Sequence, residues 1–578
     1  MKKLISLLIC IVIVLGIFAG CNNNADPKDT GADGTGGGTT NFPVSVSDSV
    51  AVGSLPLVPA GKEATISIGI MQNVNTENYD TNSYTLWLEE QTGINLEFVY
   101  FSNDKTEATQ QLNTMIGGGE ELPDILWGFS GMDDALRSEL GNDDYLVDLT
   151  DYFEEYGHWF WEAYNKVAEI DAADQERIFQ YGKDAVSGAM YAYPAYVNGT
   201  TDNCICGFIN TAWLEELDMK MPTTIDELYD VLVAFKTKDP NGNGKADEIP
   251  LIYEDGGYRC NITEWIINAY VYCNDNYFFN ATDGDLWVPY TTDEYREALK
   301  FMNKLYEEGL FSPLSWTMEN TAEMKALVTP DDGNTICGVV GGHPVLVMTS
   351  DNEAILDYTG IAPLKDETGK GGYGAMWAST FTYNTSITTD CDDPVLAFRL
   401  LDFMNSIESI NWQRYGRYGE DWEWAPEGNT SQFGLKSVIS SINGSVYSTQ
   451  NNYCWHVVNG VVRPTNMWCG IYTEEGKTDV QIRHTMISTE IYNNTVAAGA
   501  PDEVVYTLVY NEDENETVSE VKTSLKDHVK ESRALFISGA MDPNSDADWQ
   551  KYLNELESMG LSDYLDVSQS AYERMTAE

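Results

Sequence analysis

The strongest constraint on the fold is an alternation of strand-like and helix-like stretches in the first quarter of the chain. Residues 64–70 place Ile66, Ile68 and Ile70 on one face, and this period of two predicts a strand. Strands that alternate with helices predict an α/β sheet. The elements predicted next are a helix over 84–91 that ends at Gly93, a strand over 94–99, a helix over 106–116 and a strand over 122–127.

The same alternation recurs after residue 207. A short strand is predicted to end at Asn210, and a short helix over 213–217 follows it. Thr224, with Glu227 three residues later, predicts a capping box at the start of a second helix. The apolar residues of that helix fall on one face, and the helix leads directly into residues 239–248.

Residues 239–248 place oxygen-bearing side chains at alternate positions around a glycine. Calcium takes six to eight oxygen ligands, and such a loop supplies them from every second residue. Counting from Asp239 as position one, Gly244 stands at position six, where an EF-hand loop turns sharply. The donors predicted at positions one, three, five, seven and nine are Asp239, Asn241, Asn243, the Lys245 carbonyl and Asp247.

The loop is not an EF-hand, because position twelve is Pro250 and the nearest acid is Glu248 at position ten. The alternative is an Asn-Gly surface turn that binds nothing. We expect a structural calcium site, because a site that places three carboxylates on one ion would bind calcium tightly enough to be occupied at extracellular calcium concentrations.

The first twenty residues predict a secretory signal, with a basic start and an apolar stretch over 4–18. Small residues before Cys21 resemble a bacterial lipoprotein signal, in which Cys21 is diacylated. Phe18 stands where that signal usually has Leu, so an uncleaved membrane anchor is the alternative. The apolar stretch is shorter than the roughly 20 residues of a membrane-spanning helix. We therefore expect a lipid-anchored protein on the extracellular face of the bacterial cytoplasmic membrane.

Residues 21–60 carry few large apolar side chains and predict a flexible tether. The rest of the 578 residues exceeds the size that one hydrophobic core usually reaches. We expect two lobes.

The net charge of -58, from 33 Lys and Arg against 91 Asp and Glu, excludes a phosphate-backbone binder, so no nucleic acid is expected. It also disfavours an anionic ligand and favours a neutral or cationic one. The cysteines show no zinc spacing, and their disulfide pairing cannot be read from the sequence.

Five motifs follow one another along the chain: WLEEQTGI (87–94), LPDI (122–125), NTAWLEEL (210–217), PTTIDEL (222–228) and the loop 239–248. Their order is that of family 1 extracellular solute-binding proteins of ABC importers, which this chain resembles from about residue 62 to 425. A later stretch, 415–424, resembles the family's Gly-rich aromatic segment. Alginate-oligosaccharide binders of this class carry a similar calcium loop, and the resemblance adds Glu248 to the metal ligands.

The resemblance implies a type II periplasmic-binding-protein fold, in which two α/β lobes joined by a hinge close on a ligand in the cleft between them. The expected partners are an oligosaccharide or other small solute and the ABC permease subunits, and we expect a monomer. The predicted N-terminal lobe is 61–185 plus about 335–400, and the predicted C-terminal lobe is 186–334 plus about 401–578.

Aromatic rings and short polar side chains are what a sugar ligand requires. Trp127 ends a strand beside a glycine, Trp265 follows the calcium-loop region, and Trp377 lies in a glycine-rich loop. These are the predicted stacking platforms, although most tryptophans serve in packing. Further candidates are Asn78 and Tyr79 after the first strand, and Arg417 and Glu420, which could bind hydroxyls or pair with each other.

The rival interpretation is a secreted glycosidase or lyase, for which Glu420 and Glu423 would be the carboxylate pair. The five histidines are scattered without an HExxH motif, and no Gly-x-Ser-x-Gly elbow occurs. A peptide-binding or sensory lipoprotein on the same fold is a third interpretation. We expect a binding protein rather than an enzyme.

Overall fold

The chain divides into Met1–Phe42 and a compact unit, Pro43–Glu578. Signal residues 1–20 and Cys21 lie outside the described residues. No helix of the described part is long and apolar enough to cross a membrane. The computed structural model describes residues 42–162, 172–197, 207–255, 262–273, 279–318, 321–331, 333–342, 347–348, 352–374, 380–431, 436–443, 446–456, 462–463, 471–472, 479–501, 503–505 and 507–577.

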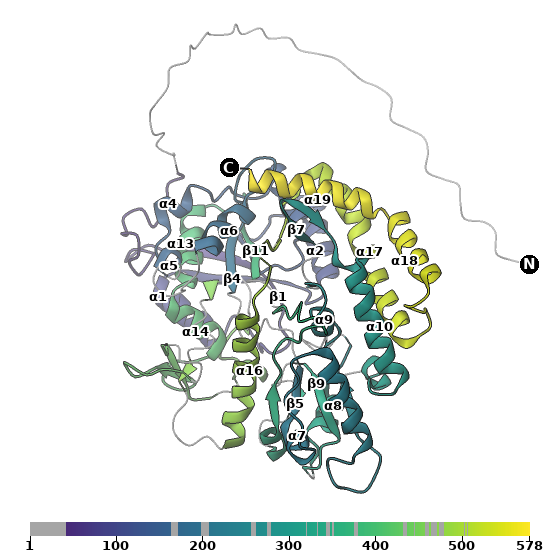
Figure 1. Ribbon diagram of the computed structural model, residues 1–578. Coiled ribbons are helices and arrows are strands. Elements are labelled where there is room, and N and C mark those ends of the chain that lie inside the picture. The colour runs from purple at the N-terminus through teal and green to yellow at the C-terminus, as the bar shows by residue number, and fades with distance from the viewer. Residues whose placement is uncertain are drawn as a thin grey trace, which may run out of the picture. The chain divides into compact units, whose positions relative to one another are not determined.

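A six-stranded sheet organises the first lobe (Figure 1). In spatial order its strands are β14 (Val462–Arg463), β4 (Tyr193–Val197), β11 (Thr380–Ile387), β3 (Ile125–Trp127), β1 (Thr65–Met71) and β2 (Asn95–Phe101). β1 pairs in parallel with both β2 and β3, and β11 runs antiparallel to β3 and β4. The first three predicted strands are thereby confirmed.

A four-stranded sheet organises the second lobe. Its strands in spatial order are β10 (Tyr358–Gly360), β5 (Gly207–Asn210), β9 (Cys337–Gly341) and β6 (Ile249–Ile252). The strands that make up each sheet show that the boundaries between the lobes differ from the predicted ones. The chain leaves the first sheet after β4 rather than near residue 185, and it returns between β10 and β11 rather than near residue 335. Loop segments carry no periodicity that marks such crossings, which explains the error.

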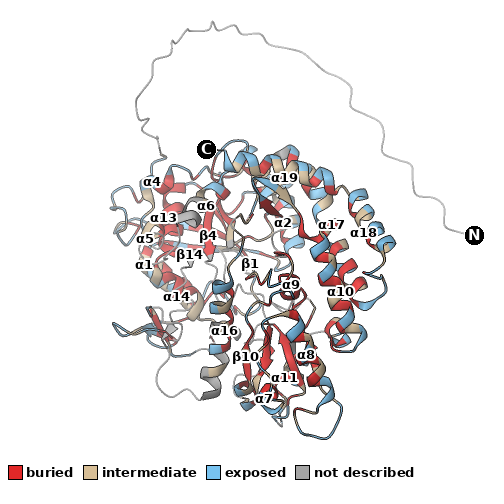
Figure 2. Cartoon of the chain, viewed as in Figure 1, coloured by how far each residue is buried: buried red, intermediate tan, exposed pale blue. Residues whose placement is uncertain are grey.

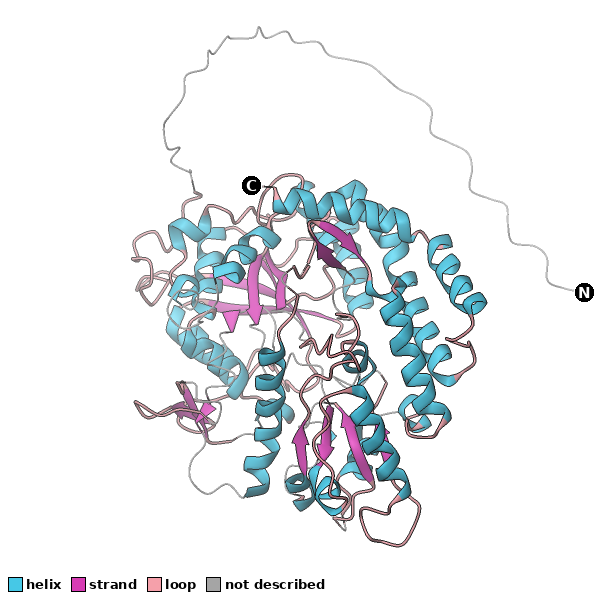
Figure 3. Cartoon of the chain, viewed as in Figure 1, coloured by secondary structure: helices cyan, strands magenta, loops and turns pink. Residues whose placement is uncertain are grey.

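The remaining strands of the described part form two smaller sheets. One contains β12 (Trp422–Trp424), β13 (Ile439–Ser441) and β15 (Ile471–Tyr472), and the other contains β7 (Asn280–Thr282) and β8 (Asp285–Trp287). Figure 3 shows helices around both larger sheets. The helices of the chain up to β5 are α1 (Ser83–Thr92), α2 (Lys105–Gly118), α3 (Asp134–Asn142), α4 (Tyr152–Tyr156), α5 (Trp159–Glu162) and α6 (Ala172–Gly182).

The later helices include a long C-terminal set that packs on the second lobe, with α10 beside α17 (Figure 1). They are α7 (Thr211–Glu216), α8 (Ile225–Thr237), α9 (Ile262–Ile267), α10 (Asp293–Glu307), α11 (Thr321–Val328), α13 (Pro394–Met404), α14 (Ile407–Tyr415), α16 (Asp479–Ala498), α17 (Glu512–Ser538), α18 (Asp546–Ser558) and α19 (Leu561–Thr576).

The largest apolar core lies in the second lobe, where the strands are buried beneath helices (Figure 2). It extends into the C-terminal helices, as in Leu525 of α17 and Tyr564 of α19. A separate core in the first lobe includes Phe101, Leu112 and Leu126. Residues beyond 479 thus help to form the second lobe, although the sequence resemblance does not reach them.

The predicted tether is too long at its C-terminal end. Leu57 and Val58 are buried, and the Arg399 guanidinium donates to the carbonyls of Ser47 at 2.7 Å and Ala51 at 2.9 Å. Residues 43–58 are therefore part of the folded unit. Their apolar residues show no periodicity, and the hydrogen bonds from Arg399 come from more than 300 positions later in the sequence.

Local capping signals are largely confirmed. Gly93 ends α1 with φ 75°, a conformation that glycine adopts without strain. Thr224 caps α8 by accepting from the Glu227 N–H at 3.3 Å. The predicted capping box is wrong in its second half, because the Glu227 carboxylate accepts from Thr223 rather than from Thr224. Four cysteines of the described part are buried free thiols: Cys273, Cys337, Cys391 and Cys454.

Candidate functional site

The carboxyl ends of three parallel strands meet at one edge of the first sheet. Because β1 pairs in parallel with β2 and with β3, the segments that follow them, starting at Gln72, Ser102 and Gly128, all begin at that edge. Open α/β sheets bind ligands at such edges.

A cavity of about 510 Å³ opens among the segments after β1 and β2. Amide, hydroxyl and carboxylate side chains dominate its wall, together with two tyrosines, and no Lys, Arg or His is among its described lining residues. Such a wall offers many hydrogen-bonding groups and an aromatic surface, which suits a hydroxyl-rich ligand. Its lining residues are 72–74, 76–80, Tyr100, Ser102 and Asn103.

Tyr100 supplies the accessible ring of this cavity. It is 40% exposed, and its ring stacks on Phe98 with centroids 6.2 Å apart. Its hydroxyl donates to Asp80 Oδ2 at 2.8 Å. Burial and this contact with a carboxylate raise the pKa of Tyr100 above its ordinary value, so the phenol remains a neutral donor. The Tyr100 side chain is thus held in place, and it is exposed where it lines the cavity.

The predicted residues Asn78 and Tyr79 both line this cavity. Asn78 is exposed, and its Oδ1 accepts from the Thr81 N–H at 2.8 Å. Tyr79 is 3% exposed, and its hydroxyl accepts from the Asn73 N–H at 3.1 Å. Asn78 is therefore placed to meet a ligand, whereas Tyr79 mainly shapes the loop. Their role in binding stays a prediction.

The loop after β1 is held by residues 446–456. Thr76 and Asn451 form an isolated bridge, and the Glu77 N–H donates to the Asn451 carbonyl at 3.1 Å. The Asn82 side chain donates to the carbonyl of Cys454 at 3.0 Å. Two segments far apart in sequence thus fix the shape of one cavity wall.

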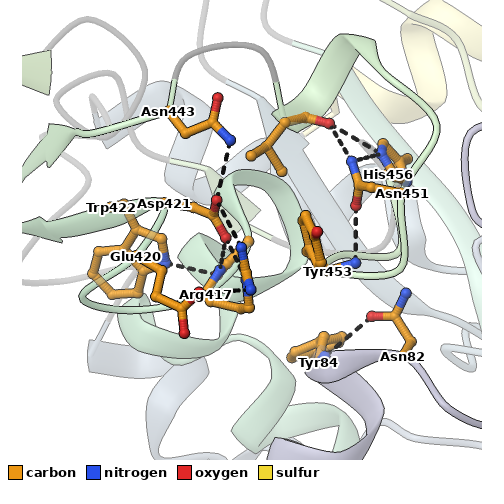
Figure 4. A network of polar contacts seen from close by, with 12 residues as sticks. Asn82, Tyr84, Arg417, Glu420, Asp421, Trp422, Asn443, Asn451, Tyr453 and His456 are labelled. Carbon is orange, nitrogen blue, oxygen red and sulfur yellow. Dashed lines mark hydrogen bonds and ion pairs between the residues drawn. The ribbon is translucent and has the colours of Figure 1, made fainter.

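His456 is central to this support (Figure 4). It is 2% exposed with φ 54°, and its Nδ1 lies 3.0 Å from Thr76 Oγ1. Its Nε2 lies 3.1 Å from the Thr449 carbonyl and 3.2 Å from Asn451 Nδ2. Burial lowers the pKa of His456, so the imidazole is neutral at physiological pH.

Arg417 and Glu420 pair with each other, one of the two expected alternatives. Arg417 Nη1 lies 2.6 Å from Glu420 Oε2, and Arg417 Nε donates to Asp421 Oδ2 at 2.8 Å (Figure 4). The guanidinium also lies 3.7 Å from the Tyr453 ring centroid. Asp421 is 1% exposed and accepts from Asn443 Nδ2 at 3.2 Å. The contacts make this group a structural anchor; a ligand role for Arg417 or Glu420 stays a prediction.

Two of the three tryptophans predicted as platforms, Trp127 and Trp265, are buried. Trp127 is 1% exposed and packs edge-on against Trp455 at 5.0 Å, while Trp265 is 2% exposed within the second-lobe core. Both indole N–H groups lack a hydrogen-bond partner among the described residues. Trp377 lies outside the described residues. Neither described ring offers an open face in this structure, and their ligand role stays a prediction.

The sequence analysis missed Tyr100 and Asp80. The reasoning applied to Trp127, that a strand's carboxyl end faces a crevice, applies equally to Tyr100 near the end of the second strand. Asp80 stands in an Asn- and Asp-rich loop next to Tyr79, which was predicted. What the sequence lacked was the contact between these two side chains.

A second cavity, of about 280 Å³, lies between the start of α3 and the first half of α17. Asp133 and Asp134 line it from α3, and Lys522 and Lys526 line it from α17. It is not at the ends of the parallel strands β1 and β2. We therefore place the candidate site in the larger cavity.

The loop 239–248 turns sharply at its glycines and is held by its own side chains. Asp239, Gly242 and Gly244 have φ of 48°, 66° and 73°, which explains two of its glycines. Asp239 Oδ1 accepts from the Asn243 N–H at 3.1 Å and Oδ2 from the Gly244 N–H at 3.0 Å. Asn243 Oδ1 accepts from the Lys245 N–H at 2.7 Å. These bonds fold the loop around its first residue.

The side chains of this loop converge on one region. Asn243 Nδ2 donates to Asp247 Oδ1 at 3.0 Å, and Glu248 Oε1 is buried without a partner among the described residues. Burial and the neighbouring carboxylates of Asp239 and Asp247 raise the pKa of Glu248. Such a set of oxygens fits a hard cation, which would relieve the repulsion.

The carboxylates alone are not sufficient for a metal site. No group of three or more His, Cys, Asp or Glu in the described part is arranged to hold a metal ion. A cation at this loop would therefore also need the oxygens of Asn241 and Asn243 and the Lys245 carbonyl, as the sequence predicts.

Known proteins share this fold. A fructooligosaccharide ABC transporter substrate-binding protein, FusA of Streptococcus pneumoniae, is 24% identical over 515 residues, covering 85% of this chain and 86% of FusA. The structure of its EF-hand mutant with fructo-nystose covers 89% of this chain and 99% of that chain, with 20% identity and a TM-score of 0.66. Lipoprotein LipO of Bacillus subtilis is 30% identical over 230 residues, covering 38% of this chain and 44% of LipO.

A solute-binding protein for human milk oligosaccharides (HMO) from Bifidobacterium longum infantis has a TM-score of 0.69 at 21% identity, covering 89% of this chain and all of that chain. This likeness confirms the predicted periplasmic-binding fold. The model of the bacterial extracellular solute-binding protein family matches residues 64–409. The chain therefore belongs to the bacterial extracellular solute-binding protein family, as its ordered motifs predicted.

Proposed function

We propose that this protein captures an oligosaccharide and delivers it to an ABC importer. The observation that carries the proposal is the cavity of about 510 Å³ at the ends of β1 and β2, with its hydrogen-bonding wall and the exposed Tyr100 ring. FusA and the HMO-binding protein, which share the fold over most of the chain, support a glycan as cargo. Lobe closure would then present the loaded form to the permease.

A calorimetric titration tests the cargo and the site together. The soluble fragment from residue 43 is titrated with kestose, fucosyllactose, a tripeptide and spermidine, with calcium present. Saturable heat with a glycan supports the proposal. Binding of only the peptide or the amine would keep the fold and overturn the cargo, and release of sugar products would indicate an enzyme.

Replacing Tyr100 by alanine is expected to weaken binding of that glycan at least about tenfold, or about 1.4 kcal/mol, because the stacking face is lost. Tyr100→Phe keeps the aromatic ring and should lose less affinity for the glycan. Tyr418→Ala, an exposed tyrosine outside the cavity, is the matched control. An unchanged Kd in Tyr100→Ala, measured by the same titration, would place the ligand elsewhere.

We propose further that the loop 239–248 holds a structural calcium ion, with Asp239, Asn241, Asn243, Lys245 through its carbonyl, Asp247 and Glu248 as ligands. The convergent oxygens of the loop support this. The ion would fasten the connection between α8 and β6 in the second lobe, and it would have no role in chemistry.

A lipid anchor at Cys21 and a monomeric state complete the proposal. The signal-like N-terminus supports the anchor, and so does the likeness to lipoprotein LipO. In bacterial cells, Cys21→Ser is expected to move most of the protein from the membrane fraction to a fraction released by mild washing. Membrane retention equal to wild type would instead indicate an uncleaved N-terminal anchor.

A further inference from the structure

The charges on the wall of the candidate cavity all have one sign. Glu77 and Asp80 are the charged residues of its lining, and both are exposed. A wall with carboxylates can accept hydrogen bonds from sugar hydroxyls, but it repels another carboxylate at short range. The cavity therefore treats neutral and acidic sugars differently.

We propose that this cavity selects oligosaccharides whose units are uncharged and rejects those that carry carboxylates, with Asp80 and Glu77 as the residues that determine this specificity. The inference rests on the proposed function and adds a substrate class to it. Acidic glycans such as uronates and sialylated chains would be excluded, and inulin-type or fucosylated chains would be accepted.

Asp80 is held in place in the cavity wall. The Tyr100 hydroxyl donates to Asp80 Oδ2 at 2.8 Å. Asp80 is also exposed, so a ligand in the cavity can reach it. Its carboxylate oxygens can therefore accept hydrogen bonds from sugar hydroxyls.

Two basic side chains of the described part, His456 and Arg417, are the ones linked to the cavity wall by the contacts above, and neither compensates this charge. His456 contacts Thr76 of the cavity wall, but it is buried and accepts or donates only as a neutral imidazole. Arg417 is engaged by the carboxylates of Glu420 and Asp421. A ligand carboxylate in the cavity would consequently face Asp80 and Glu77, with no Lys, Arg or His among the described lining residues to balance them.

Salt weakens the repulsion between the carboxylates of the cavity and those of a ligand, and this gives an experimental test. Charges a few ångströms apart near a protein surface interact appreciably, and salt screens them over about 8 Å at physiological ionic strength. Discrimination against acidic sugars should therefore decrease at high salt, whereas discrimination by shape would not.

The test compares ligands on a common core. Fucosyllactose and sialyllactose share lactose, and trigalacturonate is compared with its methyl ester; each pair differs in carboxylate charge. For wild type in 50 mM salt, we expect each acidic probe to bind at least about tenfold more weakly than its neutral partner. The measured quantity is the ratio of the two Kd values, obtained by calorimetry.

The double variant Asp80→Asn, Glu77→Gln should reduce that ratio to about threefold or less, and 500 mM salt should reduce it in wild type. The control Glu90→Gln, Glu97→Gln removes two exposed charges of the first lobe outside the cavity and should leave the ratio unchanged. Thermal unfolding confirms that the variants fold.

Two results overturn the inference alone: equal or tighter binding of the acidic probe by wild type, or a ratio that the double variant leaves unchanged. Failure of every glycan to bind at millimolar concentration, with folded protein, overturns the proposed function and the inference with it.

Discussion

Replacing Asp239 and Asp247 together by alanine is expected to remove the stabilisation of the protein by calcium. An ion that binds only the folded state raises the free energy of unfolding by about 2.7 kcal/mol when its concentration is a hundred times its Kd. The variant has lost two of the proposed carboxylate ligands, and its melting temperature in 2 mM calcium should equal its value in chelator. Thermal unfolding followed by circular dichroism measures both.

A charge-matched control is needed because the chain carries a net charge of -58. Removing any two acids from such a chain relieves repulsion and can stabilise it without calcium. Glu516→Ala with Glu520→Ala removes two exposed charges from α17 and should keep the full calcium response. If Asp239→Ala, Asp247→Ala responds to calcium as wild type does, the loop is a surface turn.

The position of the loop predicts which property changes. It connects α8 to β6, and Lys236 near the end of α8 donates to the Glu308 carbonyl at the end of α10. The candidate cavity, by contrast, is built from the first sheet. Calcium removal should therefore lower stability first, and glycan affinity should change only where the second lobe loosens.

Replacing Asp421 by alanine is expected to destabilise the folded unit by roughly 3 kcal/mol or more. Asp421 is 1% exposed and accepts from the Arg417 backbone N–H at 2.9 Å, from Arg417 Nε at 2.8 Å and from Asn443 Nδ2 at 3.2 Å. Its replacement removes the acceptor of these three hydrogen bonds, although the partial exposure of Arg417 limits the cost. Urea unfolding measures the loss.

The pH dependence of that loss has a definite sign. Burial alone would raise the pKa of Asp421, but the hydrogen bonds from Arg417 and Asn443 outweigh it, so the net pKa is lowered. A carboxyl whose pKa is lower in the folded state than in the unfolded state stabilises the folded state at pH values above its unfolded pKa of about 3.9. This stabilisation is lost as the pH falls through the folded-state pKa. The difference in the free energy of unfolding between wild type and Asp421→Asn should be largest at pH 7 and should decrease below about pH 4.

Two variants make the Asp421 prediction specific. Asp421→Asn keeps the size and one acceptor, so it should cost less than Asp421→Ala. Glu423→Gln alters an exposed acid two residues away and should be nearly neutral. Equal stability of Asp421→Ala and wild type would show that this anchor contributes nothing to the fold.

The anchor also links stability to the site. Arg417 lies over the Tyr453 ring, and the Tyr453 N–H donates to Asn451 Oδ1 at 2.8 Å. Asn451 in turn bridges to Thr76 in the cavity wall. A chain of contacts thus runs from the buried carboxylate to the loop after β1.

By itself, the sequence determined the features that depend on near neighbours. The first strands and helices, the glycine that ends α1 and the turn over 239–248 all follow from residues within about ten positions. Their hydrogen bonds join residues that are near in sequence, so the periodicity of apolar residues and the positions of glycines reveal these features. The order of such motifs was also sufficient to predict the family, which the family match over residues 64–409 confirmed.

Only the tertiary structure decided which side chains meet. Tyr100 and Asp80 face each other because β1 and β2 pair in parallel, and Trp127 is covered because Trp455 packs against it from 328 positions away. A residue's type and periodicity do not say which distant segment will cover it, since burial depends on long-range packing. For that reason two of the predicted platforms, Trp127 and Trp265, are buried in this structure, while the exposed ring of the cavity is Tyr100, which local reasoning passed over.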